Sequence, residues 1–171
     1  YAMAALFWVL VVPLWLAGCW RGEGFFVRAL VGTLVILPAW AAMVGLRERS
    51  PWLLLGLMAL VWIADSAAYF AGRRFGRHKL APGISPGKSW EGVMGAGVAL
   101  ALYASAISAA INGLRIPGAL MLAAALLYFS ILGDLFESWM KRLAGVKDSG
   151  SLLPGHGGVL DRIDALTAAL P

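Results

Sequence analysis

The chain has 171 residues, of which 61% are hydrophobic and only 13% are charged, and its mean hydropathy is +0.80. Soluble domains are about half apolar and carry about a quarter charged residues, so this composition excludes an ordinary soluble domain and indicates a membrane protein. The net charge of +5 suits anionic lipids and anionic substrates. The single cysteine, Cys19, cannot form an internal disulfide, and two histidines are too few for a zinc-ligand cluster.

Five apolar stretches are long enough, or nearly so, to cross a hydrocarbon core of about 30 Å as helices. They cover residues 3–20, 29–46, 52–71, 93–111 and 118–136. A sixth apolar segment begins at Val159 and is too short to span before the chain ends at Pro171. We expect an all-α, polytopic helical bundle with about five to six transmembrane helices and no signal peptide. It would form a single membrane domain over residues 1–171, an internal or C-terminal fragment of a longer protein.

The basic residues predict the orientation of these helices, because Lys and Arg concentrate in cytoplasmic loops. Most of them fall after the first, third and fifth predicted helices. Residues 72–91 and 138–158 are therefore expected to form two cytosolic loops that carry the active site. We expect the protein to lie in an inner (plasma) membrane, with both loops facing the cytosol.

The first polar region begins within the third predicted helix, at Asp65. An acidic residue at this depth costs roughly 2.5–3.5 kcal/mol on insertion scales, so it is either functional or paired with a basic partner on another helix. Four basic residues follow at Arg73, Arg74, Arg77 and Lys79. They could belong to a phosphate-binding region, or they could simply contact anionic lipid headgroups. Ser85, Lys88 and Ser89 then precede a helix, which predicts a phosphate-binding loop without the spacing of a Walker A motif.

The second polar region begins at the end of the fifth predicted helix. Asp134, Glu137, Ser138 and Lys141 follow at steps of three, one and three, which places them on one helical face. One interpretation is a site for an anionic, metal-dependent substrate. The other is an interfacial helix end with solvated charges and a Glu137–Lys141 ion pair.

The segment that follows carries further polar groups at Lys147, Asp148 and His156, and then two glycines, Gly157 and Gly158. The glycines make a helix unlikely here and allow backbone to lie close to a bound phosphate. His156 could act as an acid or base, or could anchor the loop through hydrogen bonds.

The last segment opens with Asp161 and Asp164, which share a helical face, while Arg162 points elsewhere. Asp161 could also be a simple helix cap or first-turn charge. Because Mg²⁺ prefers oxygen ligands and binds through one or two carboxylates plus substrate phosphates, we predict Asp134 and Asp161 as metal ligands. Asp164 is a candidate for the second shell or for a second cation.

The basic residues of this region complement developing charge on phosphoryl oxygens and are predicted phosphate contacts. They are Lys141, Arg142, Lys147 and Arg162. We place Lys141 with Asp134, Asp161 and Asp164 in the catalytic group. Asp65, Asp148, His156 and the glycines at 157 and 158 belong to the substrate-binding group, together with Ser85, Lys88, Ser89 and the other basic residues.

The order of polar residues from Ser138 to Asp164, SWMKRLAGVKDSGSLLPGHGGVLDRID, resembles the signature region of the phosphatidate cytidylyltransferase (CDP-diacylglycerol synthase) family. The segment from Asp65 to Glu91 resembles the family's Asp-Ser-x-Ala-Tyr helix end and Ser-Pro-x-Lys-Ser/Thr loop. The resemblance implies a Mg²⁺-dependent membrane enzyme of phospholipid biosynthesis, a nucleotidyltransferase. It would convert CTP and phosphatidic acid to CDP-diacylglycerol and pyrophosphate, in a bacterial inner membrane and without a nucleic-acid partner.

Three other functions remain open on the sequence alone. A CTP-dependent polyprenol kinase would need a general base, for which Asp148 or His156 could serve. An ion-coupled transporter would use the acidic residues as intramembrane ligands, and a lipid-binding scaffold would leave the paired carboxylates unexplained. Small residues recur every fourth position from Gly97 to Ala109 and predict close helix packing within the protomer, with a homodimer interface as the alternative.

Overall fold

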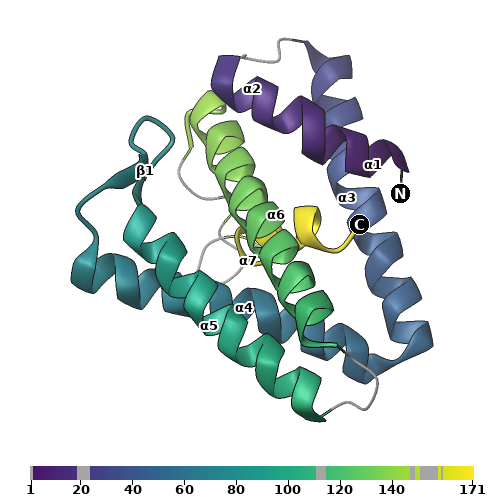
Figure 1. Ribbon diagram of the computed structural model, residues 1–171. Helices are drawn as coiled ribbons and strands as arrows, with labels where there is room; N and C mark the ends of the chain where they lie inside the picture. The colour runs from purple at the N-terminus through teal and green to yellow at the C-terminus, as the bar shows by residue number, and fades with distance from the viewer. Residues whose placement is uncertain (1, 19–23, 111–114, 147–148, 151–157, 159) are drawn as a thin grey trace. The chain divides into compact units, whose positions relative to one another are not determined.

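The computed structural model describes residues 2–18, 24–110, 115–146, 149–150, 158 and 160–171, the side chains of 161 and 162 excepted (Figure 1). The described chain is helical apart from one short hairpin, which confirms the all-α fold class. The elements in order are α1 (Ala2–Leu6), the π-helical turn η1 (Phe7–Val11), α2 (Val12–Gly18), α3 (Phe25–Arg49), α4 (Pro51–Phe75), β1 (Lys79–Ala81), β2 (Ser85–Ser89), α5 (Trp90–Ala110), α6 (Ile116–Leu143) and α7 (Leu160–Ala169).

Four of these helices, α3, α4, α5 and α6, are long and apolar enough to cross a membrane, and Ala2–Gly18 is a shorter apolar helix. The predicted polytopic membrane bundle is thus confirmed. The first predicted helix is divided by the π-helical turn of η1 into α1 and α2. The others each extend beyond at least one of the ends that hydropathy predicted, because polar residues continue the helices past their apolar cores.

Helix ends follow local capping chemistry. Ser50 precedes α4, its Oγ accepts a hydrogen bond from the Leu53 N–H at 3.4 Å, and Pro51 occupies the first helical position. At the C-terminal end of α6, Gly145 has a φ of +71°. Its N–H bonds to the Arg142 carbonyl while the Val146 N–H bonds to the Lys141 carbonyl, which is the Schellman arrangement. The helix therefore runs to Leu143 and carries Asp134, Glu137 and Lys141 on regular backbone.

The chain divides into two compact units, each described by itself. One unit comprises residues 55–128. It contains most of α4, the hairpin of β1 and β2, α5 and the first part of α6. The antiparallel hairpin pairs Lys79 with Ser89 and Ala81 with Ser85, and it joins the end of α4 to the start of α5 (Figure 1). A Cβ on Gly97 would lie 3.7 Å from Leu127 Cδ2, so the small-residue face of α5 packs against α6 within this unit.

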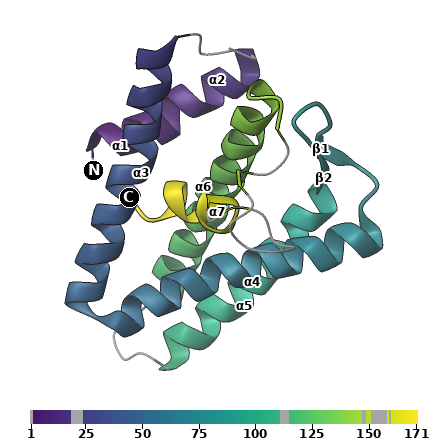
Figure 2. The ribbon, with the colours of Figure 1, turned by 180° about the vertical axis from the view of Figure 1, so that it is seen from behind.

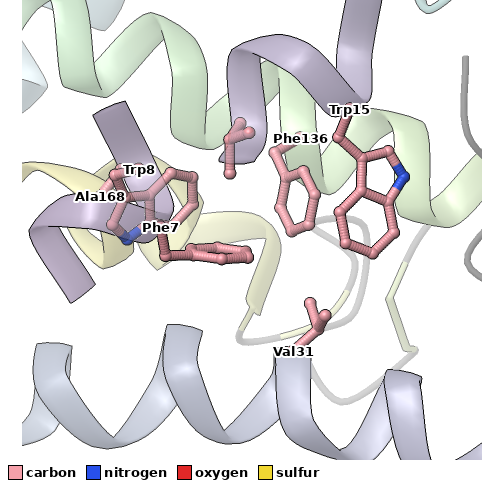
Figure 3. Packing of buried hydrophobic residues seen from close by; sticks show 7 residues of the cluster. Phe7, Trp8, Trp15, Val31, Phe136 and Ala168 are labelled. Atoms are coloured by element: carbon pink, nitrogen blue, oxygen red, sulfur yellow. The ribbon is translucent and has the colours of Figure 1, made fainter. Parts of the chain in front are cut away.

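The other unit comprises residues 1–54 and 129–171, and an aromatic cluster forms its core. Phe136 of α6 makes edge-to-face contacts with Phe7, Trp8 and Trp15, with ring centroids 5.6–5.7 Å apart (Figure 3). Val31 of α3 and Ala168 of α7 belong to the same cluster. Since Phe136 is adjacent to Glu137, this packing fixes the polar end of α6 relative to α7.

Candidate functional site

The polar residues of α6 lie on one helical face, as their spacing predicts. The Ser138 hydroxyl donates to Asp134 Oδ1 at 3.4 Å, and Lys141 Nζ lies 2.9 Å from Glu137 Oε2. Both pairs are separated by one helical turn. The structure thus brings together Asp134 and Lys141, two of the four predicted catalytic residues, along one side of the helix.

Glu137 is buried, with only 7% of the residue exposed. The interpretation of this helix end as a row of solvated charges is therefore wrong for Glu137, although the predicted ion pair with Lys141 is present. Tertiary packing explains this burial. Phe136, the residue before Glu137, packs in the aromatic core, so this turn of α6 is covered by other helices of the same unit. Asp134, Ser138 and Lys141 are partly exposed beside it.

A close crossing of two helices places Asp164 beside this face. A Cβ on Gly133 would lie 2.6 Å from the Asp164 carbonyl oxygen and 3.1 Å from Ala168 Cβ, so only glycine allows α7 to approach α6 this closely. Both ribbon views show α7 next to α6 (Figures 1 and 2). The residue that permits the crossing directly precedes Asp134, so the crossing brings the middle of α7, at Asp164, Ala165 and Ala168, to the acidic end of α6.

Asp164 makes local hydrogen bonds within α7. Its Oδ1 accepts from the Ala165 N–H at 2.7 Å, and its carbonyl oxygen accepts from Thr167 Oγ1 at 2.6 Å. Its carboxyl group is close enough to Glu137 for electrostatic interaction. The α6–α7 crossing thus brings the carboxyl group of Asp164 near the Glu137–Lys141 pair. Carboxylates from two helices and a lysine are groups that can bind a cation and an anionic ligand.

Other predicted residues of this region are described only in part. The Asp161 and Arg162 side chains lie outside the description, although both residues are in α7. Lys147, Asp148, His156 and Gly157 also lie outside the described residues. Arg142 is exposed at the end of α6. Gly158 is buried, and a Cβ there would lie 2.8 Å from the Gly150 N, so backbone packs closely at this glycine.

The described side chains include no group of three or more His, Cys, Asp or Glu residues gathered as a metal site. The chemistry of the donors nevertheless fits a hard divalent cation, because the donors at the α6–α7 crossing are carboxylate oxygens, which Mg²⁺ prefers. The predicted ligands Asp134 and Asp164 lie on the two helices of this crossing, and Asp161 lies one turn before Asp164.

The second polar region lies in the other unit, around the hairpin. Ser89 is buried, and its Oγ accepts a hydrogen bond from the Gly92 N–H at 3.2 Å, which makes it the N-cap of α5. A Cβ on Gly72 or Gly76 would lie 3.1 or 2.9 Å from the same oxygen. The glycines of α4 and its C-terminal end therefore make room for the Ser89 hydroxyl, and its predicted substrate contact remains a prediction.

The other predicted residues of this region are more accessible. Ser85 and Lys88 are partly exposed on β2, and Asp65 is exposed on α4. The hairpin is fastened to α5 by Glu91, whose Oε1 lies 2.7 Å from His78 Nδ1 and which also accepts from the His78 N–H. The spacing of His78 and Glu91 resembles no motif, so the sequence did not indicate this contact.

Replacing Ser89 by Ala is expected to lower the free energy of unfolding by about 1 kcal/mol, because α5 loses its capping hydroxyl. Thermal unfolding in detergent measures this effect, and Ser66→Ala, an exposed position on α4, is the matched control. Unchanged stability in Ser89→Ala would contradict the capping role.

Two residues of the α6–α7 crossing were missing from the predicted site. Glu137 was placed on the polar face of the helix but was given no catalytic or binding role, because spacing on a helix does not reveal which turn is buried. Gly133 was not singled out, although a glycine directly before an acidic residue in an apolar helix is a usable signal for close helix approach. Phe7, Trp8 and Trp15, whose rings pack on Phe136, lie more than a hundred residues away in sequence and carried no local signal.

Comparison with known proteins gives the context of these residues. The sequence profile of the cytidylyltransferase family matches residues 1–171. The phosphatidate cytidylyltransferase of Pseudomonas aeruginosa is 49% identical over 179 aligned residues, covering 99% of this chain and 65% of the relative.

Phosphatidate cytidylyltransferases of two other bacteria are also similar. The phosphatidate cytidylyltransferase of Haemophilus influenzae is 55% identical, covering 70% of this chain and 43% of the relative. The protein of that name from Thermotoga maritima is 42% identical, covering 67% and 45%. The aligned part of the chain thus spans between 43% and 65% of the length of these curated relatives.

Proposed function

Because the chain belongs to the cytidylyltransferase family, we propose that it transfers the cytidylyl group of CTP to phosphatidic acid, forming CDP-diacylglycerol and pyrophosphate. The observation that carries the proposal is the α6–α7 crossing, where Asp164 lies near the buried Glu137, which pairs with Lys141 on the face of α6 that also carries Asp134. Carboxylates for a cation and a lysine for phosphate are the groups that nucleotidyl transfer requires.

The proposed cofactor is Mg²⁺, with a second cation as a further element of the site. Asp134, Asp161 and Asp164 are the residues that would hold it. When bound, Mg²⁺ would neutralise negative charge on the triphosphate of CTP. The carboxylate oxygens that α6 and α7 supply through Asp134 and Asp164 support this assignment, because Mg²⁺ prefers oxygen ligands.

The proposed reaction asks the protein mainly for positioning and charge complementarity. The second pKa of a phosphate monoester is about 6, so phosphatidate is largely a dianion at pH 7 and needs no general base. One of its oxygens forms a bond to the α-phosphorus of CTP as the bond to the bridging oxygen of the leaving pyrophosphate breaks. Lys141 and Arg142 then stabilise charge on the phosphoryl oxygens.

The membrane placement supports this use of the site. Asp134 and Lys141 lie in the C-terminal third of α6, after a long apolar stretch, so a lipid headgroup could reach them while its acyl chains stay in the bilayer. We propose that the protein lies in the inner membrane of a bacterial cell and that the loops around residues 72–91 and 138–158 face the cytosol. CTP would then reach the site from the cytosol. The contact of Gly97 with α6 favours packing within one protomer for the small-residue face over a homodimer interface.

The test is product formation by the purified protein in phosphatidate-containing mixed micelles with CTP and Mg²⁺. We expect CDP-diacylglycerol and pyrophosphate to appear in equal amounts, and both to disappear when phosphatidate or Mg²⁺ is omitted. The P. aeruginosa relative, assayed in parallel, controls for the lipid preparation. Release of pyrophosphate without a cytidylylated lipid would contradict the proposed acceptor.

A further inference from the structure

Glu137 combines three properties that an ordinary helix-surface glutamate lacks. It is 93% buried, since only 7% of the residue is exposed. One carboxylate oxygen, Oε2, lies 2.9 Å from Lys141 Nζ, and the other, Oε1, has no hydrogen-bond partner. A second carboxyl group, that of Asp164, is close enough to interact with it.

This arrangement is a poor way to stabilise a fold. Desolvation of a buried ion pair can exceed the Coulomb attraction that the pair gains, and an unpartnered buried oxygen adds a further cost. The neighbouring Asp164 carboxyl adds like charge. An apolar residue at position 137 would avoid all three costs while filling the same space.

The arrangement does, however, determine where Lys141 points. Lysine has a flexible four-carbon stem, and at a membrane interface it normally extends toward water or headgroups. Here the side chain of Lys141 is only 18% exposed, because it turns back along α6 to Glu137. Its ammonium group is thereby kept at the acidic face that also carries Asp134.

We propose that Glu137 is a positioning residue that acts through Lys141, holding the lysine ammonium at the α6–α7 crossing where it meets the phosphates of the nucleotide. The inference rests on the proposed cytidylyl transfer. Glu137 itself need not touch the substrate: its carboxylate fixes the lysine before the nucleotide binds, so less side-chain freedom is lost in the transition state.

A double-mutant cycle tests this role by comparing Glu137→Gln, Lys141→Met and the double variant. We expect kcat to fall about 10-fold in Glu137→Gln and about 100-fold in Lys141→Met, with the KM for CTP changed by less than about 2-fold. The double variant should be no slower than Lys141→Met alone, because Glu137 has nothing left to position. Glu48→Gln, exposed at the end of α3, is the matched control.

Three results would overturn the proposal. Wild-type kcat in Glu137→Gln would show that the lysine needs no positioning. Losses that multiply in the double variant would give Glu137 an independent role, such as binding a cation through Oε1. If Glu137→Gln lost folded protein and activity to the same extent, the role of Glu137 would be structural. The double variant lacks both charges of the pair, so it controls for misfolding caused by one unpaired charge.

A second measurement does not depend on turnover. Acylation of lysines by an N-hydroxysuccinimide ester, mapped by mass spectrometry, reports how freely each ammonium group moves. Lys141 should react at least about 3-fold faster in Glu137→Gln than in the wild type, while the exposed Lys79 reacts equally in both. Unchanged Lys141 reactivity would overturn the positioning role, whereas a wild-type protein that makes no CDP-diacylglycerol would overturn only the proposed reaction.

Discussion

Replacing Asp134 by Asn is expected to lower kcat by about 10²- to 10³-fold, the loss typical of removing one preorganised electrostatic group from an active site. Asn keeps the size of the side chain and can still accept from Ser138, so the helix face should persist. Only the negative charge is lost, and with it the proposed attraction for Mg²⁺. Initial rates of CDP-diacylglycerol formation measure the effect over a series of Mg²⁺ concentrations.

The control separates loss of charge at the site from loss of charge in general. Glu48→Gln removes one exposed carboxylate from α3 and should retain the wild-type rate. Both variants should elute and unfold like the wild type in detergent. Full activity of Asp134→Asn at every Mg²⁺ concentration would remove Asp134 from the site and leave the metal assignment without its α6 ligand.

Replacing Gly133 by Ala is expected to lower kcat by about 10²-fold even though the change adds a single methyl group. Its Cβ would lie 2.6 Å from the Asp164 carbonyl oxygen, so α7 must move away from α6. Asp164 would then shift relative to Glu137 and Lys141, and a misplacement of about 1 Å can cost this much in rate. The measurement is kcat with saturating CTP and phosphatidate, together with the unfolding temperature.

Gly118→Ala is the matched substitution, because Gly118 lies on the same helix and a Cβ there would meet nothing within 4 Å. It should retain both rate and stability, and gain slightly in helix propensity. If Gly133→Ala is as active as Gly118→Ala, the close crossing is not needed for catalysis, and the site would have to be built from α6 alone.

The fold was largely predictable from hydropathy, and the reasons for the differences are local. Apolar stretches located α3 to α6, because a membrane span requires about 20 apolar residues whatever its neighbours are. Their ends were misplaced where polar residues continue a helix, as in α6 up to Leu143, which a Schellman turn at Gly145 closes. The hairpin of β1 and β2 was not predicted, since its alternation is interrupted by Pro and Gly.

The candidate site was predictable as far as residues share one element. Helical spacing placed Asp134, Ser138 and Lys141 on one face, and their contacts confirm it. Spacing could not show that Glu137 is buried, because burial depends on the packing of Phe136 against Trp8 and Trp15 from the start of the chain. Nor could it show that Gly133 brings Asp164 to this face, since that is a contact between two helices.

The most direct measurement of the central claim follows the two ends of the CTP triphosphate. The protein is incubated with phosphatidate, Mg²⁺ and CTP labelled at either the α- or the γ-phosphorus, and a polyprenol is offered in a parallel reaction. Cytidylyl transfer predicts α label in lipid and γ label in pyrophosphate. Transfer of γ label to the polyprenol would identify a kinase, and label in neither lipid, while the P. aeruginosa relative is active, would contradict the proposed enzymatic function of this chain.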